Sequence, residues 1–430
     1  MVGTFSSLNI SEIKQSAGAL FMKVGGVLSH FILIYLISNY YGVYEVGLFA
    51  LVSTLIQFGV ILGKMGMDNA VMKFQSESYA VGDKVLARRF YWYCSKNVAI
   101  GSIIVAFSFY LLKDFFASFF NNTELKSLAI YISLSIPPLA LTYLVGESLK
   151  SKRKISASIF FNSVSRYLIA IIIIFFYSWF FKGVNVVIVY SIAIVFTFIM
   201  TFRHFQSNWP IVKFPTLDQG KIVKKFAVPL LLVSLIQVSA QQINIIILGA
   251  MSDELQVGYF SVIQRISMVM TLPLFAINAV ITPLISRHFK NGEFNKLKRS
   301  VKRMSLFALV STLPFFLLVF TFPKIPLTFF GQEYSELGLA LIVISIGQLI
   351  NVSAGSVGYV LQLCDKHILY RNIILATVII IIMSSIILIP IYNVMGACIS
   401  NAIGMIFLNV TSSFYVKKEF NFYPTFLIPR

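Results

Sequence analysis

Four ionisable residues lie deep inside long apolar stretches of this 430-residue chain: Lys23, His30, Arg166 and Arg265. At a helical rise of about 1.5 Å per residue, Lys23, Arg166 and Arg265 would lie roughly 12, 16 and 14 Å from the nearer ends of their stretches. A charge held in hydrocarbon is costly and usually marks a functional path. The sequence offers no acid of comparable depth to pair with Lys23 and Arg265, which favours a water-filled lumen that could hold an anion.

Amide side chains recur at helical spacing along the same apolar stretches. They are Gln237, Gln241, Asn244, Gln264, Gln348 and Asn351. Steps of three and four residues place such side chains on one helix face. They could either bond neighbouring membrane helices together or line a lumen with donors and acceptors for sugars. Together with the cations, they suggest a polar cavity suited to an anionic, sugar-bearing substrate.

Two of the four ionisable residues have a second possible role. His30 could relay protons, or it could be a hydrogen-bonded packing residue. Arg166 could face the lumen, or it could pair with Glu147 in the preceding stretch. Lys64 and Glu147 lie near the ends of their stretches, where reaching the membrane interface explains them.

The elements that must position these residues are membrane-spanning helices. The chain is 58% hydrophobic and only 12% charged, with a mean hydropathy of +0.84, whereas a soluble domain carries about 25% charged residues. A span needs about 20 mostly apolar residues and, in lipid, must be a helix or part of a closed barrel. We therefore predict an all-α polytopic membrane protein with about twelve spans: 16–38, 46–66, 92–112, 127–147, 155–181, 184–203, 227–250, 256–286, 304–323, 337–361, 370–391 and 394–416.

The gaps between the predicted spans alternate between basic and neutral or acidic. Basic gaps surround Arg88, Arg153, Lys225 and Arg299, whereas the gaps between them carry residues such as Glu124. Because Lys and Arg stay on the cytoplasmic side during insertion, both termini are expected in the cytoplasm. The same bias explains the net charge of +19 without nucleic-acid binding. The first apolar stretch is expected to be a retained span, not a signal peptide.

The chain also repeats itself. Val46-Gly47-Leu48-Phe49 recurs 211 residues later as Val257-Gly258-Tyr259-Phe260, and Gly82-Asp83 recurs 210 residues later as Gly292-Glu293. This predicts two parallel six-helix halves, 1–210 and 227–430, joined by a cytoplasmic linker at 211–226. Such repeats are related by an axis along the membrane normal, with a substrate site between them.

Signals for covalent chemistry are missing from the sequence. There is no Walker loop, no GxGxxG before a helix, and no metal-ligand spacing among Cys94, Cys364 and Cys398. We therefore expect no catalytic residues, no cofactor and no metal.

Several of these motifs resemble one family. The stretches Tyr41–Phe49, Gly66–Ala70, Val257–Phe260 and Pro283–Arg287 are similar to the Wzx-type polysaccharide flippases, members of the multidrug/oligosaccharidyl-lipid/polysaccharide (MOP) exporter superfamily. The resemblance implies a MOP/MATE-like fold in the cytoplasmic (inner) membrane. It also implies flipping of undecaprenyl-pyrophosphate-linked oligosaccharides, as in O-antigen and lipopolysaccharide assembly, to the periplasmic leaflet. Lumenal cations in the first and eighth spans are a family property, and Lys23 and Arg265 occupy comparable places.

The resemblance also implies partners for this protein. They are the lipid-linked oligosaccharide, membrane lipid, and the polysaccharide polymerase and chain-length proteins. Two other functions stay open from the sequence. One is a cation-coupled multidrug exporter of the same superfamily, although the first span lacks the acidic residue that such exporters use. The other is a multispan transferase, for which Asp68 and Glu77 would be the only candidate residues.

Overall fold

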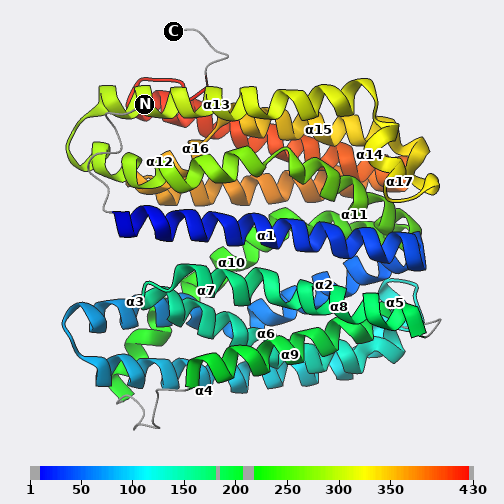
Figure 1. Ribbon diagram of the computed structural model, residues 1–430, viewed down its shortest axis with the longest axis horizontal. Helices are drawn as coiled ribbons and strands as arrows, with labels where there is room; N and C mark the ends of the chain where they lie inside the picture. Colours follow the sequence, from blue (N-terminus) through cyan, green and yellow to red (C-terminus); the bar gives the residue numbers. More distant parts are fainter. Residues whose placement is uncertain (1–9, 181–184, 207–216, 426–430) are drawn as a thin grey trace. The chain divides into compact units, whose positions relative to one another are not determined.

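The computed structural model describes residues 10–180, 185–206 and 217–425, and over these ranges the chain is helical, without strands (Figure 1). The helices are α1 (Ile10–Tyr41), α2 (Val43–Lys64), α3 (Met67–Ala80), α4 (Lys84–Leu111), α5 (Lys113–Phe119), α6 (Glu124–Ser151), α7 (Ile155–Ile159), the π-helix η2 (Phe160–Val164), α8 (Ser165–Phe180), α9 (Val186–Gln206), α10 (Leu217–Met251), α11 (Glu254–Val269), α12 (Leu272–Lys290), α13 (Phe294–Thr321), α14 (Lys324–Thr328), the 3₁₀-helix η3 (Gln332–Leu337), α15 (Gly338–Ala354), α16 (Val357–Leu363) and α17 (His367–Phe420).

The predicted number of spans agrees with these helices. Within the described ranges, eleven helices are long and apolar enough to cross a membrane. The last of them, α17, has 54 residues and a non-helical residue at Asn393 (φ 48°, ψ −125°). This residue divides α17 into two segments that match the predicted spans 370–391 and 394–416. Counted in this way, the described residues hold twelve segments long and apolar enough to span a membrane, and the all-α polytopic prediction is confirmed.

The eighth predicted span, 256–286, is wrong in one respect, because it is not continuous. The helix breaks at Met270–Thr271, between α11 and α12. Pro273 is the physical reason, since proline has no N–H to donate and its ring collides with the carbonyl four residues earlier, here that of Val269. The side-chain hydroxyl of Thr312 in α13 donates to the Met270 carbonyl at 3.0 Å, so the break does not leave that oxygen unsatisfied.

Two further breaks occur at glycines. The predicted span 337–361 is interrupted after α15 at Gly355, which has φ 64°, a left-handed conformation that favours glycine. The turn between α2 and α3 contains Gly66 at φ 75°. A Cβ atom at Gly66 would also collide with the Ala227 carbonyl in α10, so both conformation and space require glycine there.

The helices group into two compact units, Met1–Tyr40 with Leu51–Val238, and Tyr41–Ala50 with Ser239–Arg430. In the first unit α3 packs on α4, α4 on α6, and α6 on α9; in the second α12 packs on α13, α13 on α15, and α15 on α17. The order of neighbours is thus the same in both units. It is the order expected of a repeat, although the predicted parallel relation of the two halves stays a prediction.

The predicted linker, 211–226, falls only partly within the described residues. Residues 211–216 lie outside them, and residues 217–226 are the first turns of α10. The division between the two compact units falls within the same helix, between Val238 and Ser239. Helix α10 therefore begins before the predicted second half does.

The repeated Val-Gly-x-Phe motifs meet inside the second unit. A Cβ atom at Gly47 in α2 would collide with the Glu254 carbonyl, and a Cβ atom at Gly258 in α11 would collide with the Val43 carbonyl. Val43 and Glu254 are 211 residues apart, as are Gly47 and Gly258, so the contact is reciprocal. Membrane helices approach this closely only where residues are small. The sequence repeat is therefore a packing motif in which each copy makes room for the other.

The glycine contact can be tested by enlarging one side chain. We expect Gly47→Val and Gly258→Val each to destabilise the folded protein, by about 1–3 kcal/mol, as overpacking does. The measurement is the thermal midpoint of the detergent-purified protein. Gly25→Val is the matched control, because a Cβ atom at Gly25 meets nothing within 4 Å. Equal midpoints for Gly47→Val and Gly25→Val would contradict the packing argument.

The side of the membrane on which each gap lies can be tested with alkaline phosphatase fusions. Since the enzyme is active only outside the cytoplasm, fusions after Glu124, Asp253 or Glu333 should be active. Fusions after Lys154, Lys225 or Arg299 should be inactive, because basic gaps are retained in the cytoplasm. Activity at the basic gaps would reverse or refute the predicted topology.

Candidate functional site

In the first unit, Lys23 presents an exposed side chain on α1. Lys150, at the end of α6, is near enough to act on it electrostatically. Lys150 is itself paired with Glu147 at 2.5 Å, so Lys23 is the main positive charge on this part of the unit. Such a region attracts anions, and the effect is larger where water is partly excluded.

Arg166 lies at the start of α8 and is only 5% exposed. Its Nη1 donates to the Tyr143 hydroxyl at 3.1 Å and to the Asn162 carbonyl at 2.6 Å, and its Nη2 donates to the Tyr167 hydroxyl at 3.1 Å. Its guanidinium carbon is also 4.6 Å from the centre of the Tyr167 ring. Hydroxyl groups and ring faces therefore enclose this cation in the conformation described here.

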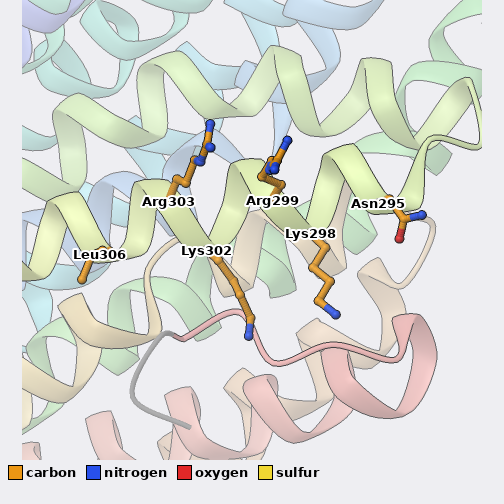
Figure 2. A pocket seen from close by; sticks show the side chains of 6 residues that line it. All are labelled: Asn295, Lys298, Arg299, Lys302, Arg303 and Leu306. Atoms are coloured by element: carbon orange, nitrogen blue, oxygen red, sulfur yellow. The ribbon is translucent and has the colours of Figure 1, made fainter. Parts of the chain in front are cut away.

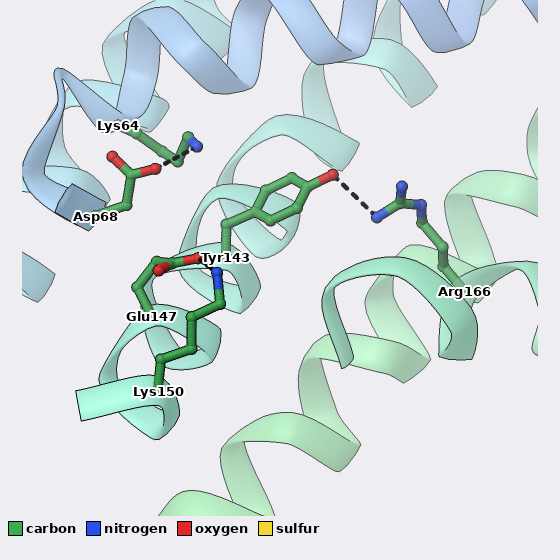
Figure 3. A network of polar contacts seen from close by, with 6 residues as sticks. All are labelled: Lys64, Asp68, Tyr143, Glu147, Lys150 and Arg166. Carbon is green, nitrogen blue, oxygen red and sulfur yellow. Dashed lines mark hydrogen bonds and ion pairs between the residues drawn. The ribbon is translucent and has the colours of Figure 1, made fainter. Parts of the chain in front are cut away.

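The predicted alternative partner of Arg166 is engaged elsewhere. Glu147 forms an ion pair with Lys150 at 2.5 Å, and no carboxylate pairs with Arg166 within the described part of the chain. Figure 3 shows this ion pair, a second ion pair formed by Lys64 and Asp68, and Arg166, all near Tyr143. The proposed Glu147–Arg166 pair is therefore absent from this conformation.

Tyr143 links Arg166 to a second buried cation. Lys64 lies 4.8 Å from the centre of the Tyr143 ring and pairs with Asp68 at 2.6 Å. Lys64 and Asp68 are both at most 9% exposed. The pair is therefore largely buried, and Lys64 does not extend to water as the sequence suggested.

A π-helical turn precedes Arg166. This turn, Phe160–Val164, carries Asn162, whose carbonyl accepts from Arg166. A Cβ atom at Gly146 in α6 would collide with the Asn162 amide, so α6 and the turn are in close contact. Isolated π-turns inside helices are rare and often occur at functional sites.

His30 in α1 joins the same cluster from another side. Its ring stacks on that of Tyr167, with centroids 4.3 Å apart and planes 16° apart. Tyr167 in turn accepts from Arg166. The imidazole is thus one ring away from a buried cation, a position compatible with packing and with proton relay alike.

In the second unit, Arg265 lies half-buried on α11. Its Nη1 is 3.5 Å from the Met268 sulfur, one turn further along the helix. The neighbouring Gln264 is buried and donates to the Gln241 carbonyl of α10 at 3.3 Å. Arg265 is therefore the more accessible of these two polar residues.

Half of the six predicted amides, namely Asn244, Gln264 and Asn351, bond to another helix within the second unit. Asn244 accepts from Ser385 at 2.6 Å and donates to the Ala397 carbonyl at 3.4 Å. Asn351 donates to Gln348 at 3.3 Å and accepts from Asn409 at 3.2 Å. Gln237 and Gln241, by contrast, have exposed side chains. The structure thus gives Asn244, Gln264 and Asn351 partners of the kind that the helix-packing alternative requires, whereas Gln348 bonds to Asn351 within α15.

Three features of these polar clusters were not identified from the sequence: Tyr143, Asn409 and the Lys64–Asp68 ion pair. Tyr143 and Asn409 gave no signal, because single tyrosines and asparagines are common in membrane helices. The pair of Lys64 and Asp68 did give one, since a spacing of four residues places opposite charges on one helix face.

Comparison with known proteins places this fold and these residues in a family. The family described as "Polysaccharide biosynthesis protein" matches residues 14–289, more than half of the chain, and the family described as "MatE" matches residues 229–395. The first match includes Lys23, Arg166 and Arg265. No curated protein matches the chain.

Solved structures of about this length share the fold at low sequence identity. The MATE multidrug transporter DinF-BH has 16% identity, a TM-score of 0.69 and 96% coverage of both chains. An inward-facing MATE family transporter of the MOP superfamily has 15% identity and a TM-score of 0.72, with 94% of this chain and 98% of the other covered. The lipid II flippase MurJ in an inward closed conformation has 17% identity and a TM-score of 0.71, with 95% and 89% covered. The chain therefore belongs to the polysaccharide biosynthesis protein family, shares the fold of these solved structures, and is a multi-pass membrane protein.

Proposed function

We propose that this protein flips lipid-linked oligosaccharides, carried on undecaprenyl pyrophosphate, from the cytoplasmic to the periplasmic leaflet of the inner membrane. The observation that carries the proposal is the polysaccharide biosynthesis family match over residues 14–289, which includes both Lys23 and Arg265. The O-antigen repeat unit is the substrate class that we favour. The polysaccharide polymerase and chain-length proteins would then act on the product.

The chemistry of the two cations supports an anionic substrate. A pyrophosphate cannot enter hydrocarbon without compensation of its charge, and fixed cations beside water lower that cost. Lys23 is exposed and Arg265 half-exposed, so each unit supplies a cation to which an anion has access. No bond in the substrate has to form or break.

The other predicted site residues would have different roles. Gln237 and Gln241, which are exposed, can offer donors and acceptors to sugars. Asn244, Gln264, Gln348 and Asn351 would contribute only if they exchanged their present partners. Arg166 would reach an anion only after its tyrosine cover moved, so we assign it to a later step of the cycle than Lys23.

A drug exporter is the second candidate, and the MatE match over residues 229–395 favours it. Against it, the described first span, Gly18–Tyr41, contains no Asp or Glu. Lys23 would repel an organic cation.

Deleting the gene separates the two functions. Loss of surface polysaccharide with accumulation of lipid-linked units supports the flippase, whereas drug sensitivity with normal polysaccharide supports the exporter.

The cationic path is tested by neutralising its two charges. We expect Lys23→Ala and Arg265→Ala each to reduce polysaccharide export about ten- to hundredfold, since a charged hydrogen bond contributes about 1.5–3 kcal/mol. Charge reversal to Glu should be worse, and exchange between Lys and Arg should be tolerated better. Export is measured as surface polysaccharide per inserted protein.

Lys126→Ala is the matched control. Lys126 forms an exposed ion pair with Asp114, a kind of pair that contributes little to stability. This variant should insert and export normally. Normal export by both Lys23→Ala and Arg265→Ala would remove the physical basis of the anionic-substrate proposal.

The role of His30 is tested separately. If its imidazole relays protons, His30→Ala should slow transport and flatten its dependence on pH between about 5 and 8, the range in which histidine titrates. His30→Phe preserves a ring that can stack on Tyr167, so it separates packing from titration. A pH profile in His30→Phe equal to that of the wild type would show that His30 only packs.

A further inference from the structure

Helix α13 carries four cations on two adjacent rows of its first turns. Lys298 and Lys302 form one row, and Arg299 and Arg303 form the other (Figure 2). Together with Asn295 and Leu306 they line a pocket of about 410 Å³. In Figure 2 the lysines extend to one side of the helix and the arginines to the other. Because both rows line the same pocket, that pocket has positive charge on two sides.

No carboxylate within the described ranges pairs with any of the four. The nearest acid in the sequence, Glu293, is already engaged by Lys296 at 2.7 Å and by His288 at 2.8 Å. The hydrogen bonds from Lys296 and His288 hold the pKa of Glu293 below its ordinary value, so this carboxylate stays committed to them. The pocket therefore keeps four positive charges without an internal counterion.

The length of α13 places these cations at the level of lipid headgroups. Its 28 residues span about 42 Å at 1.5 Å per residue, whereas the hydrocarbon core is about 30 Å thick. If the apolar end of the helix lies in hydrocarbon, the surplus of roughly 12 Å falls at the basic end. The predicted topology puts this end on the cytoplasmic side, where leaflets carry anionic lipids.

The rows of cations continue into an apolar surface on the same helix. Phe307, Val310 and Leu317 are 57%, 56% and 54% exposed. They follow Arg303 at spacings of four, seven and fourteen residues, which keeps them near its helix face. An exposed apolar face that follows a cationic pocket along the helix matches a molecule with an anionic head and hydrocarbon chains.

We propose that this face of α13 binds an anionic phospholipid, with the phosphate between the two cationic rows and the acyl chains along Phe307, Val310 and Leu317. Charge complementarity selects the head, and the apolar continuation selects a lipid over free phosphate. The site is separate from Lys23 and Arg265, so the substrate proposal does not depend on it.

The insertion bias alone does not account for the pattern. It requires basic residues in the gap but not on adjacent rows of one helix. In the first unit, at the sequence offset of 210 residues, Trp92 and Tyr93 of α4 stand where α13 has Lys302 and Arg303. Tyr93 is used there to bond the Gly220 carbonyl of α10. The four-cation arrangement is therefore particular to α13.

Lipid retention by the purified full-length protein tests the site. The protein is equilibrated with phosphatidylglycerol and phosphatidylcholine of identical chains, and bound lipid is counted by native mass spectrometry. Wild-type protein should prefer phosphatidylglycerol. Because each cation near an anionic surface contributes about fivefold, Lys298→Gln with Lys302→Gln should reduce that preference by roughly 25-fold.

The matched control removes the same charge from the same gap. Lys290 and Lys296 lie outside the pocket lining, so Lys290→Gln with Lys296→Gln should keep the preference. Lys298→Arg with Lys302→Arg should keep it as well, and this variant separates charge loss from misfolding. Equal loss in the pocket and control variants would overturn the proposal by showing that only total charge matters.

Two competition experiments identify the occupant. Inorganic phosphate at equal concentration should not displace phosphatidylglycerol, because it lacks the acyl contact; displacement would overturn the lipid assignment. Undecaprenyl pyrophosphate should compete no better than another anionic lipid. Much stronger competition would also overturn the phospholipid assignment and would make the pocket a site for the carrier lipid.

Discussion

The reciprocal contact of Gly47 and Gly258 is the constraint that fixes how the first turns of α2 pack on α11 in the second unit. In lipid, apolar side chains gain little by leaving one hydrocarbon environment for another, so helices associate through close contact of their backbones. Here the contact is made by the first turns of α2, and the rest of α2 belongs to the first unit. Helix α2, like α10, thus has residues in both units, and two missing side chains allow its first turns to approach α11 closely.

Polar groups in the two units are satisfied in different ways. In the first unit Arg166 is held by tyrosine hydroxyls and a carbonyl, and Lys64 by Asp68. In the second unit amides such as Asn244 bond across helices. Both arrangements reduce the cost of burying polar groups in hydrocarbon, although Nε of Arg166 and Oδ1 of Asp68 are buried without a hydrogen-bond partner. Lys23 has an exposed side chain on α1, and this exposure makes it the stronger candidate for contact with a substrate.

Much of this fold could be predicted from the sequence because its signals are local. Hydropathy marked the spans, and the motifs at Gly47 and Gly258 marked the repeat. The break at Met270–Thr271 was harder, since Pro273 permits either a kink or a full interruption and the Thr312 hydroxyl that stabilises the break is 42 residues away. Only part of the surroundings of Arg166 could be predicted. Tyr167 and Asn162 lie one and four residues away on the same helical segment, whereas Tyr143 becomes a partner only through the packing of α6 on the π-turn.

The π-turn before Arg166 also determines how α8 is rotated about its axis relative to the helical turn α7 that precedes it. A π-helical turn holds about one residue more than an α-helical turn, whose residues are each separated by about 100°. Deleting one residue within Phe160–Val164 would restore a regular helix and would rotate everything on one side of it by about that angle relative to the other. Arg166 would then turn away from Tyr143 of α6, whereas Tyr167, its neighbour in α8, would turn with it. The extra residue of the π-turn is therefore what directs the Arg166 guanidinium toward Tyr143 of α6.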